Sequence, residues 1–295
     1  MSKKKLFFSS TAEMTCLFRA KSFGETRQHF KGDDFIAVMI CYALNSFLSL
    51  MHKSFLLNDE MFNTSVPPGA YEYILGRTNF LDNIFMTLPA DCKQVFILGA
   101  GFDSRCCRFQ QQLRHCQVYE VDHPDMQQQK RAIFKKIDID FPANVHFIAI
   151  DFSRQRINEI LTQRAIPRGE KCFFVLEGLT YYLEAEQVEA IFTAISRHGG
   201  PGSQVFFDYV DTAAIAGENS QYGLQECVTA VRKLGEAWTF GIEADKAAQF
   251  LAPFHFDIIE QLTSREMEEQ YFTDEHHNRL AKTMSSLTLV RAQRV

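Results

Sequence analysis

Two patterns of apolar positions follow one another along the chain. Up to about residue 85, apolar residues recur without strict alternation, which is typical of helices, and the Pro-Pro-Gly triplet at 67–69 predicts a turn between them. From Gln94 onward, short apolar runs alternate with helical stretches. We therefore expect a helical N-terminal segment (1–85) before an α/β core (86–295), together forming one compact domain.

The short runs of the second part have the composition of β-strands. They are apolar throughout and do not alternate, so both faces of each strand should be covered, as in a parallel sheet. Five of them start roughly 22 to 32 residues apart, which is the spacing of βα units, and two more follow near the C-terminus. The runs are 95–98, 118–121, 145–150, 172–176, 204–207, 256–259 and 286–290.

The order of these runs predicts a doubly wound α/β sheet of about seven strands, in which the late final pair forms an antiparallel edge hairpin. Apolar residues at 188, 191, 192 and 195 lie on one face of a helix that would pack on the sheet. The polar-rich stretch 211–250 is too long for a plain loop. It predicts a helical insertion that caps the ligand cleft.

The composition is that of a globular protein, which excludes a disordered or collagen-like chain. Of the 295 residues, 46% are hydrophobic and 23% charged. A formal net charge of -5 argues against a nucleic-acid-binding protein, which is usually basic. Residues 35–51 are nearly all apolar, but the run is shorter than the ~20 residues of a membrane span and includes Asn45, Ser46 and Ser49. It predicts a buried helix, and we expect no membrane partner.

The cysteines and histidines indicate neither disulfides nor a metal. The eight cysteines form no Cys-x-x-Cys pair, and no signal peptide is recognisable, so we expect reduced thiols in a cytoplasmic protein. The pair His276-His277 predicts a surface segment, because no metal-ligand spacing accompanies it. The run Lys3-Lys4-Lys5 predicts a solvated basic tail.

The first four strands of the predicted core each end in glycine or an acid. Residues 99–101 read Gly-Ala-Gly, and Asp122 follows about 20 residues later, where a carboxylate can accept hydrogen bonds from ribose hydroxyls. Asp151 and Glu177 end the third and fourth strands. Ligands of such sheets bind at the carboxyl ends of the strands, so these groups should converge on one cleft.

The same positions predict the kind of ligand. Ser104 stands where a dinucleotide fingerprint has its third glycine, and a row of carboxylates would repel phosphates. A nucleoside with a cationic or polar tail fits better. Asp151 could accept from an adenine amino group, and the backbone N–H of Phe152 could donate to the ring.

Several segments together resemble the leucine carboxyl methyltransferase family of S-adenosylmethionine-dependent O-methyltransferases, most closely its bacterial members. The most specific are GAGFDSR at 99–105 and EVDHP at 120–124. The others are Arg19-Ala20, GRTNFLD at 76–82, LEGLTYYL at 176–183 and WTFGI at 238–242.

The resemblance implies a class I methyltransferase fold that binds S-adenosylmethionine. By position, Arg77 would reach the methionine carboxylate and Glu177 the methionine amino group. Gly99 would lie against the cofactor, Asp122 would bind the ribose, and Asp151 with Phe152 would bind the adenine. Arg19, in the N-terminal helix, is a further candidate.

The acceptor could be a carboxylate or a hydroxyl of a small molecule or a peptide end. A carboxylate is ionised at pH 7 and needs no base, whereas a hydroxyl would gain about 10²–10⁴-fold from one. Tyr182 and Tyr209 are candidates for that base, and His123 should be too far from the methyl group. Two alternatives stay open, an NAD-type oxidoreductase and a non-catalytic nucleoside-binding protein.

Overall fold

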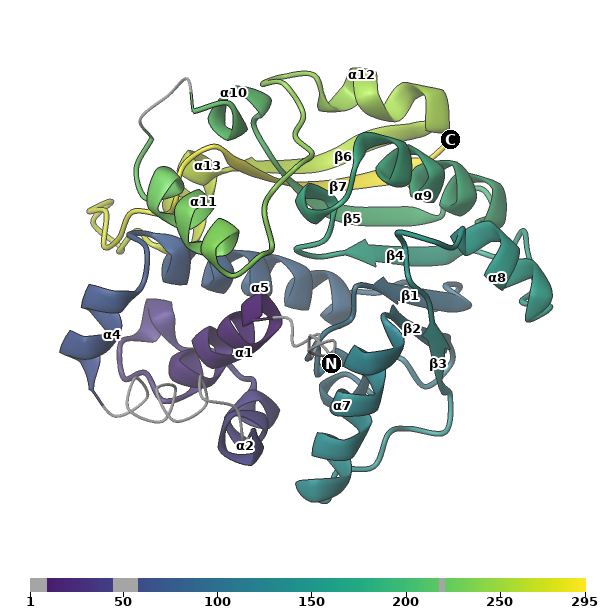
Figure 1. The fold of residues 1–295 in the computed structure, drawn as a ribbon, viewed down its shortest axis with the longest axis horizontal. Coiled ribbons are helices and arrows are strands. Elements are labelled where there is room, and N and C mark those ends of the chain that lie inside the picture. The colour runs from purple at the N-terminus through teal and green to yellow at the C-terminus, as the bar shows by residue number, and fades with distance from the viewer. Residues whose placement is uncertain (1–9, 45–57, 218–220) are drawn as a thin grey trace, which may run out of the picture.

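One mixed sheet organises the chain (Figure 1). The computed structural model describes residues 10–44, 58–217 and 221–295. In it, seven strands pair in the order β3-β2-β1-β4-β5-β7-β6, and β1 to β5 run parallel. The strands are β1 Gln94–Leu98, β2 Gln117–Asp122, β3 Val145–Ala149, β4 Cys172–Leu176, β5 Gln204–Val210, β6 Phe256–Thr263 and β7 Leu287–Arg294. The predicted doubly wound sheet is confirmed, with all seven runs as strands.

The last two strands pair antiparallel, as predicted, but they are not a simple hairpin. β7 lies between β5 and β6 and runs antiparallel to both, so β6 forms the edge of the sheet. The connection between them contains helix α13 (Ser264–Tyr271). Each of these two strands extends beyond its apolar run. β7 keeps its register with β5 through polar residues such as Arg291 and Gln293, and β6 continues alongside β7.

Helices flank the sheet and extend beyond its ends. The N-terminal helices are α1 Ser10–Phe23, α2 Phe35–Ala43, α4 Asp59–Ser65 and α5 Ala70–Met86. Those of the core are α6 Arg105–Arg108, α7 Pro124–Lys136, α8 Ile157–Gln163 and α9 Ala185–His198. The stretch after β5 holds α10 Thr212–Ile215, α11 Leu224–Lys233 and α12 Ala247–Leu251. Short 3-10 turns are η1 Gln28–Phe30, η2 Thr180–Tyr182 and η3 Ala252–Phe254.

Side chains of each strand alternate between two apolar layers. On β1, Val95 and Ile97 pack into the layer that contains α1, α5 and α7, while Phe96 and Leu98 pack into the layer of α8, α9 and α12. This double burial explains why the central parallel strands are largely apolar, whereas in the edge strand β3 only Ile148 is buried and His146 is exposed. The apolar stripe of α9 is buried in the second layer, as predicted.

Several helices begin at a residue whose side chain accepts a hydrogen bond from the first turn of the helix. The Asp34 carboxylate accepts from the Ala37 N–H at 3.0 Å and caps α2. Helix α2 confirms the predicted helix only over Phe35–Ala43, because 45–51 lie outside the described residues, as does the Lys3–Lys5 tail. Within the described ranges, no helix is both long enough and apolar enough to cross a membrane.

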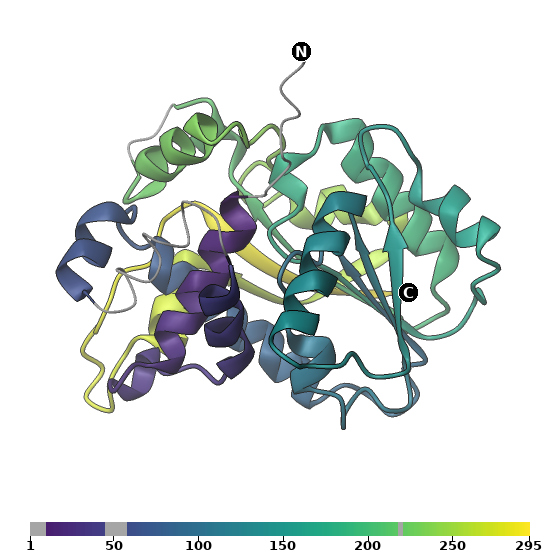
Figure 2. The same cartoon turned by 60° about the horizontal axis from the view of Figure 1, so that its bottom comes forward.

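The N-terminal helices and α11 gather at one end of the sheet. Figures 1 and 2 show α1 and α4 on the side toward which β4 and β5 point, with α11 beside them. Segments from the start of the chain and from the stretch after β5 therefore meet at the carboxyl ends of the parallel strands.

Candidate active site

A cavity of about 660 Å³ opens at the carboxyl ends of the parallel strands. Its walls come from the tips of β1 to β4, from α1 and α5, and from α11 with the loop that follows it. Seven residues were predicted to bind a cofactor. Five lie at the strand tips, Arg77 lies on α5, and Arg19 lies on α1. All seven line the cavity: Arg19, Arg77, Gly99, Asp122, Asp151, Phe152 and Glu177.

At the tip of β1, the backbone of Gly99 lines the cavity. Gly99 has a φ of +68°, and an added Cβ would lie 3.0 Å from Cδ1 of Leu179 at the tip of β4. A side chain at this position would therefore combine backbone strain with crowding. Glycine leaves the peptide accessible from the cavity, as a close-lying ligand requires.

Asp122 links the tips of β1 and β2. Its two carboxylate oxygens accept from the N–H groups of Gly101 and His123, each at 2.6 Å. Burial raises the pKa of Asp122, although these two hydrogen bonds oppose the shift. A carboxylate has about four acceptor sites, so lone pairs remain for two ligand hydroxyls. This geometry fits a ribose.

The tip of β3 is more open than the others. Asp151 accepts from the N–H of Ser153 at 3.0 Å and from its hydroxyl at 2.5 Å, and the Ser153 hydroxyl lowers the pKa of Asp151. The backbone carbonyl of Phe152 accepts from the Gln187 amide at 3.1 Å. Both residues line the cavity beside Ile150, where a planar ring could lie against apolar surface.

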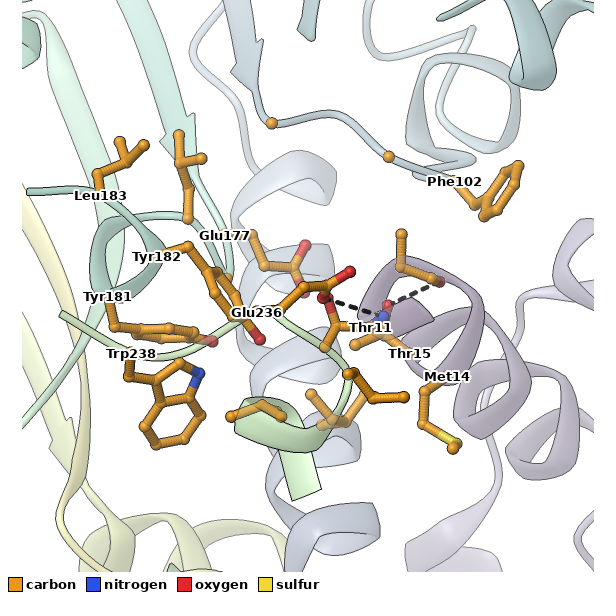
Figure 3. A pocket seen from close by; sticks show the side chains of 18 of the residues that line it. Thr11, Met14, Thr15, Phe102, Glu177, Tyr181, Tyr182, Leu183, Glu236 and Trp238 are labelled. Atoms are coloured by element: carbon orange, nitrogen blue, oxygen red, sulfur yellow. Dashed lines mark hydrogen bonds between the residues drawn. The ribbon is translucent and has the colours of Figure 1, made fainter. Parts of the chain in front are cut away.

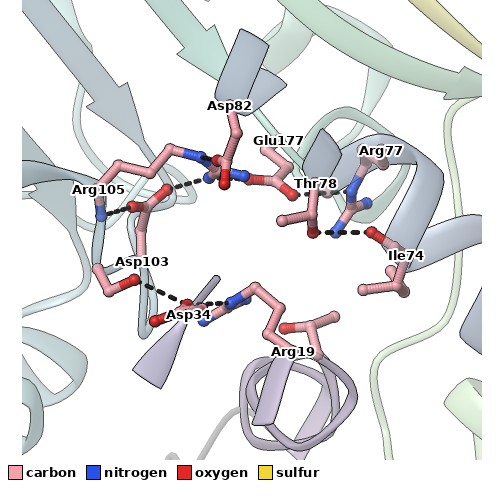
Figure 4. A network of polar contacts seen from close by, with 12 residues as sticks. Arg19, Asp34, Ile74, Arg77, Thr78, Asp82, Asp103, Arg105 and Glu177 are labelled. Atoms are coloured by element: carbon pink, nitrogen blue, oxygen red, sulfur yellow. Dashed lines mark hydrogen bonds and ion pairs between the residues drawn. The ribbon is translucent and has the colours of Figure 1, made fainter. Parts of the chain in front are cut away.

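Glu177 and Arg77 form a buried ion pair between β4 and α5. Arg77 Nε lies 2.9 Å from Glu177 Oε1, and Arg105 Nη1 lies 2.6 Å from Glu177 Oε2 (Figure 4). Burial would raise the pKa of Glu177, but the two guanidinium groups outweigh it and hold the pKa below its ordinary value. Glu177 is therefore ionised and suited to an ammonium or sulfonium cation.

Arg105 extends this network away from the cavity. Its Nη1 pairs with Asp103 at 2.5 Å and its Nε with Asp82 at 2.6 Å. Asp82 also pairs with Arg108 at 2.8 Å. Arg77 and Asp82 both lie on α5 but have separate partners. Arg77 is buried and does not pair with Asp82.

Asp208 on β5 is a residue that our sequence analysis missed. It is fully buried, and it accepts from Arg77 Nη1 at 2.7 Å, from Tyr73 at 2.8 Å and from the Gly178 N–H at 2.6 Å. It therefore fixes the direction of the Arg77 guanidinium and the tip of β4 together. A charged residue inside an otherwise apolar strand was the signal that could have identified it.

Tyr209, one of the two candidate bases, does not line this cavity. Side chains of a strand alternate, so Asp208 points to the cavity layer and Tyr209 to the opposite one, where it packs with Phe207. Tyr209 instead borders a second, polar pocket near β6 and β7. The prediction that Tyr209 is a base facing the cleft was therefore wrong, because its side chain lies on the opposite face of the sheet from the cavity.

Arg19 reaches the cavity from α1. Its Nε pairs with Asp34 at 2.9 Å, and its Nη2 donates to the carbonyl of Phe102 at 2.7 Å. Although burial opposes it, Asp34 raises the pKa of Arg19. These contacts hold the N-terminal helix against the loop after β1 (Figure 4).

The wall farthest from the strand tips is largely apolar and aromatic. It combines Met14 and Phe18 of α1 with Val231 and Leu234 of α11 and its following turn. Figure 3 shows Tyr182 and Trp238 on one side of this space and α1 on the other. Glu236 crosses between them, because its carboxylate accepts from both the N–H and the hydroxyl of Thr11.

Comparisons with known proteins agree with this arrangement. The sequence model of the leucine carboxyl methyltransferase family matches residues 12–196. A Bacillus subtilis protein, YktD, named as an S-adenosyl-L-methionine-dependent methyltransferase, is 27% identical over 205 residues, 69% of this chain and 67% of its own. A similarly named Mycolicibacterium paratuberculosis protein is 32% identical over 130 residues, 44% of this chain and 42% of its own. The chain thus spans less than half of that second relative.

A solved structure extends the similarity to nearly the whole fold. The crystal structure of a Thermobifida fusca protein described as a methyltransferase superposes with a TM-score of 0.58 at 17% identity, covering 95% of this chain and 94% of that chain. The fold is that of the class I methyltransferases, with an antiparallel seventh strand inserted beside the fifth.

Proposed function

Because the chain belongs to the leucine carboxyl methyltransferase family, we propose that it transfers a methyl group from S-adenosylmethionine to a carboxylate oxygen of its acceptor. The observation that carries the proposal is the convergence of four strand tips on one cavity. Gly99, Asp122, Asp151 and Glu177 reach it from β1 to β4, and Arg77 reaches it from α5.

These residues fit the cofactor group by group. The carboxylate of Asp122 suits the ribose, and Asp151 with the Phe152 N–H suits the adenine. Glu177 suits the amino group of the methionine part. Arg77 keeps Nη2 without a hydrogen-bond partner among the described residues, and that atom can bind the methionine carboxylate.

When bound, the cofactor supplies an electrophilic methyl group on a cationic sulfur. The acceptor oxygen forms the new C–O bond as the C–S bond breaks, and the electron pair of that bond stays on sulfur. Negative and positive charge neutralise each other in this step, so an apolar, water-free wall favours it. The protein contributes alignment of the acceptor and exclusion of water.

Three titratable side chains of the described lining, Tyr182, Glu177 and Glu236, are poorly suited as bases, which favours a carboxylate acceptor over a hydroxyl. His123 also lines the cavity, but it lies next to Asp122 on the ribose side. Burial raises the pKa of Tyr182, so its hydroxyl stays protonated at pH 7. Both oxygens of Glu177 are bound by arginines, and the Glu236 carboxylate is bound by Thr11. A carboxylate acceptor is already ionised and transfers no proton.

The pH dependence of turnover tests this choice. With a carboxylate acceptor, kcat should be nearly flat between pH 6 and 9, because no group needs to lose a proton. A kcat that rises about tenfold per pH unit over that range would indicate a hydroxyl acceptor with a titrating base. Calorimetry with S-adenosylhomocysteine and with NAD excludes the oxidoreductase alternative if only the first binds. The non-catalytic alternative requires binding without turnover on any acceptor.

A further inference from the structure

Trp238 places a buried, unsatisfied hydrogen-bond donor at the cavity. The residue is 7% exposed and lines the wall beyond the strand tips. Its indole Nε1–H forms no well-aligned hydrogen bond within the described part of the chain, although the Tyr182 hydroxyl lies near enough to interact with it. A buried donor without a good acceptor is unfavourable, and an indole N–H can only donate. A ligand that brings an oxygen acceptor would satisfy it.

The position of the indole is fixed by its neighbours. The next residue, Thr239, donates its N–H to the Tyr181 carbonyl at 2.8 Å and its hydroxyl to the Leu183 carbonyl at 2.8 Å. The indole packs on the Tyr181 ring at 4.7 Å between centroids. Figure 3 shows its nitrogen on the side of the ring that faces Tyr181 and Tyr182, and the Tyr182 hydroxyl interacts with it. Tyr182 is only half-buried, so a turn of its ring would open the N–H to an acceptor.

The surrounding wall limits what else the acceptor can carry. In the described lining the arginines are Arg19 and Arg77, and both are paired with buried acids. A second anionic group would find no unpaired cation there. The apolar side chains of Met14, Phe18 and Val231 offer no partners for the amide groups of a peptide, which are costly to bury unpaired.

From these observations we infer that the acceptor is a monocarboxylic acid with an apolar body, oriented by Trp238. This rests on the proposed function. The indole N–H donates to one carboxylate oxygen while the other forms the new bond to the methyl carbon, and the C–S electron pair leaves with sulfur. Trp238 is then a specificity-determining residue, and a peptide C-terminus is a poor acceptor.

Because Trp238 is the sole tryptophan of the 295-residue chain, its fluorescence reports on this position alone. The wild-type protein, saturated with S-adenosylhomocysteine, is titrated with octanoate, 4-phenylbutyrate, succinate and a leucine-terminated tripeptide. We expect the two apolar monocarboxylates to change the emission at concentrations at least about tenfold below those of the other two. Equal responses to all four, or a response to the tripeptide alone, would overturn the inference.

Trp238→Phe removes the N–H and keeps an aromatic ring. We expect it to raise KM for the preferred acid about tenfold or more, with the Kd for S-adenosylhomocysteine within twofold of wild type. A KM within twofold of wild type would show that Trp238 does not bind the acceptor. If S-adenosylhomocysteine fails to bind the wild type, the proposed function itself fails. If it binds and only the acid preference is absent, the inference alone fails.

Discussion

At the scale of single residues, Arg77 has an ion-pairing role in the fold in addition to the ligand-binding role that we propose. Its guanidinium lies between Glu177 and Asp208, both of which are mostly or fully buried. Removing the cation would leave the fully buried Asp208 uncompensated, at a cost of about 3–5 kcal/mol, whereas Glu177 would keep its ion pair with Arg105. Alanine is therefore unsuitable as a test of binding at this position, and lysine, which retains the charge, is preferable.

Arg77→Lys should raise the Kd for S-adenosylhomocysteine about tenfold, because a lysine ammonium cannot form the two parallel hydrogen bonds that a guanidinium donates to a carboxylate. Methylthioadenosine lacks the amino-acid tail, so its Kd should change less than twofold. Calorimetric titration of both ligands measures the difference. Equal losses for the two ligands would assign Arg77 a structural role only.

Asp122→Ala should reduce affinity for S-adenosylhomocysteine by about 10- to 150-fold, the range for hydrogen bonds to a charged group. The matched control is Asp125→Ala, which removes the same charge nearby, from an exposed position in the first turn of α7. Kd values from the same titration decide. An unchanged Kd for Asp122→Ala, with an unchanged melting temperature, would reject the ribose assignment.

Because of Asp103, the free energy of unfolding should depend on pH in the acid range. Burial would raise its pKa, but Arg105 lowers it to about 2. Since its folded pKa lies below the unfolded value near 3.9, the unfolded chain binds more protons between these pH values, and stability falls as pH decreases from about 4 to 2. In Asp103→Asn, the free energy of unfolding should fall by about 2 kcal/mol less between pH 4 and pH 2 than in the wild type, measured by urea unfolding at several pH values. Parallel wild-type and variant curves would contradict the assignment.

The sequence identified site residues where a short motif marks a strand tip. Gly99, Asp122 and Glu177 could be predicted because each ends an apolar run. Asp208 could not, because it lies inside a strand, and its partners Tyr73 and Arg77 come from a helix more than 100 residues earlier. Such contacts depend on the packing of α5 against the sheet, which no local pattern encodes.

At the scale of elements, α11 is docked by a close backbone contact. Gly223, just before the helix, has a φ of +72°, and an added Cβ would lie 1.7 Å from the carbonyl oxygen of Pro68. The sequence predicted a helical cover over 211–250, and α11 does line the cavity through Cys227, Ala230 and Val231. It could not indicate that this cover docks on the 67–69 turn, because the contact joins segments far apart in the chain.

Gly223→Ala should lower the free energy of unfolding by more than 2 kcal/mol, because it adds a backbone clash to the ~1–2 kcal/mol of left-handed strain. Gly235→Ala is the matched control. That glycine has a similar φ of +80° but no heavy atom within 4 Å of the added Cβ, so only the strain should remain. Equal losses by urea denaturation would show that α11 does not depend on this contact.

At the scale of the whole molecule, the sheet provides the side of the cavity that we propose for the cofactor, and the flanking helices provide the side that we propose for the acceptor. The family match covers residues 12–196 and therefore includes the first four strand tips. Trp238, Asp208 and α11 lie beyond it. The number of strands and the doubly wound sheet followed from the apolar runs, but the placement of β7 between β5 and β6 did not. The shape of the proposed acceptor wall depends on side chains from both ends of the chain.

The most direct test of the account is the chemical nature of the methylated product. The protein is incubated with methyl-labelled S-adenosylmethionine and 4-phenylbutyrate, and the product is treated with mild alkali. A methyl ester is hydrolysed and releases its label as volatile methanol, whereas a methyl ether keeps it. We predict that the transferred label is released as methanol. Label that remains bound after alkali, or transfer to hydroxyl compounds and not to any carboxylic acid, would contradict the account.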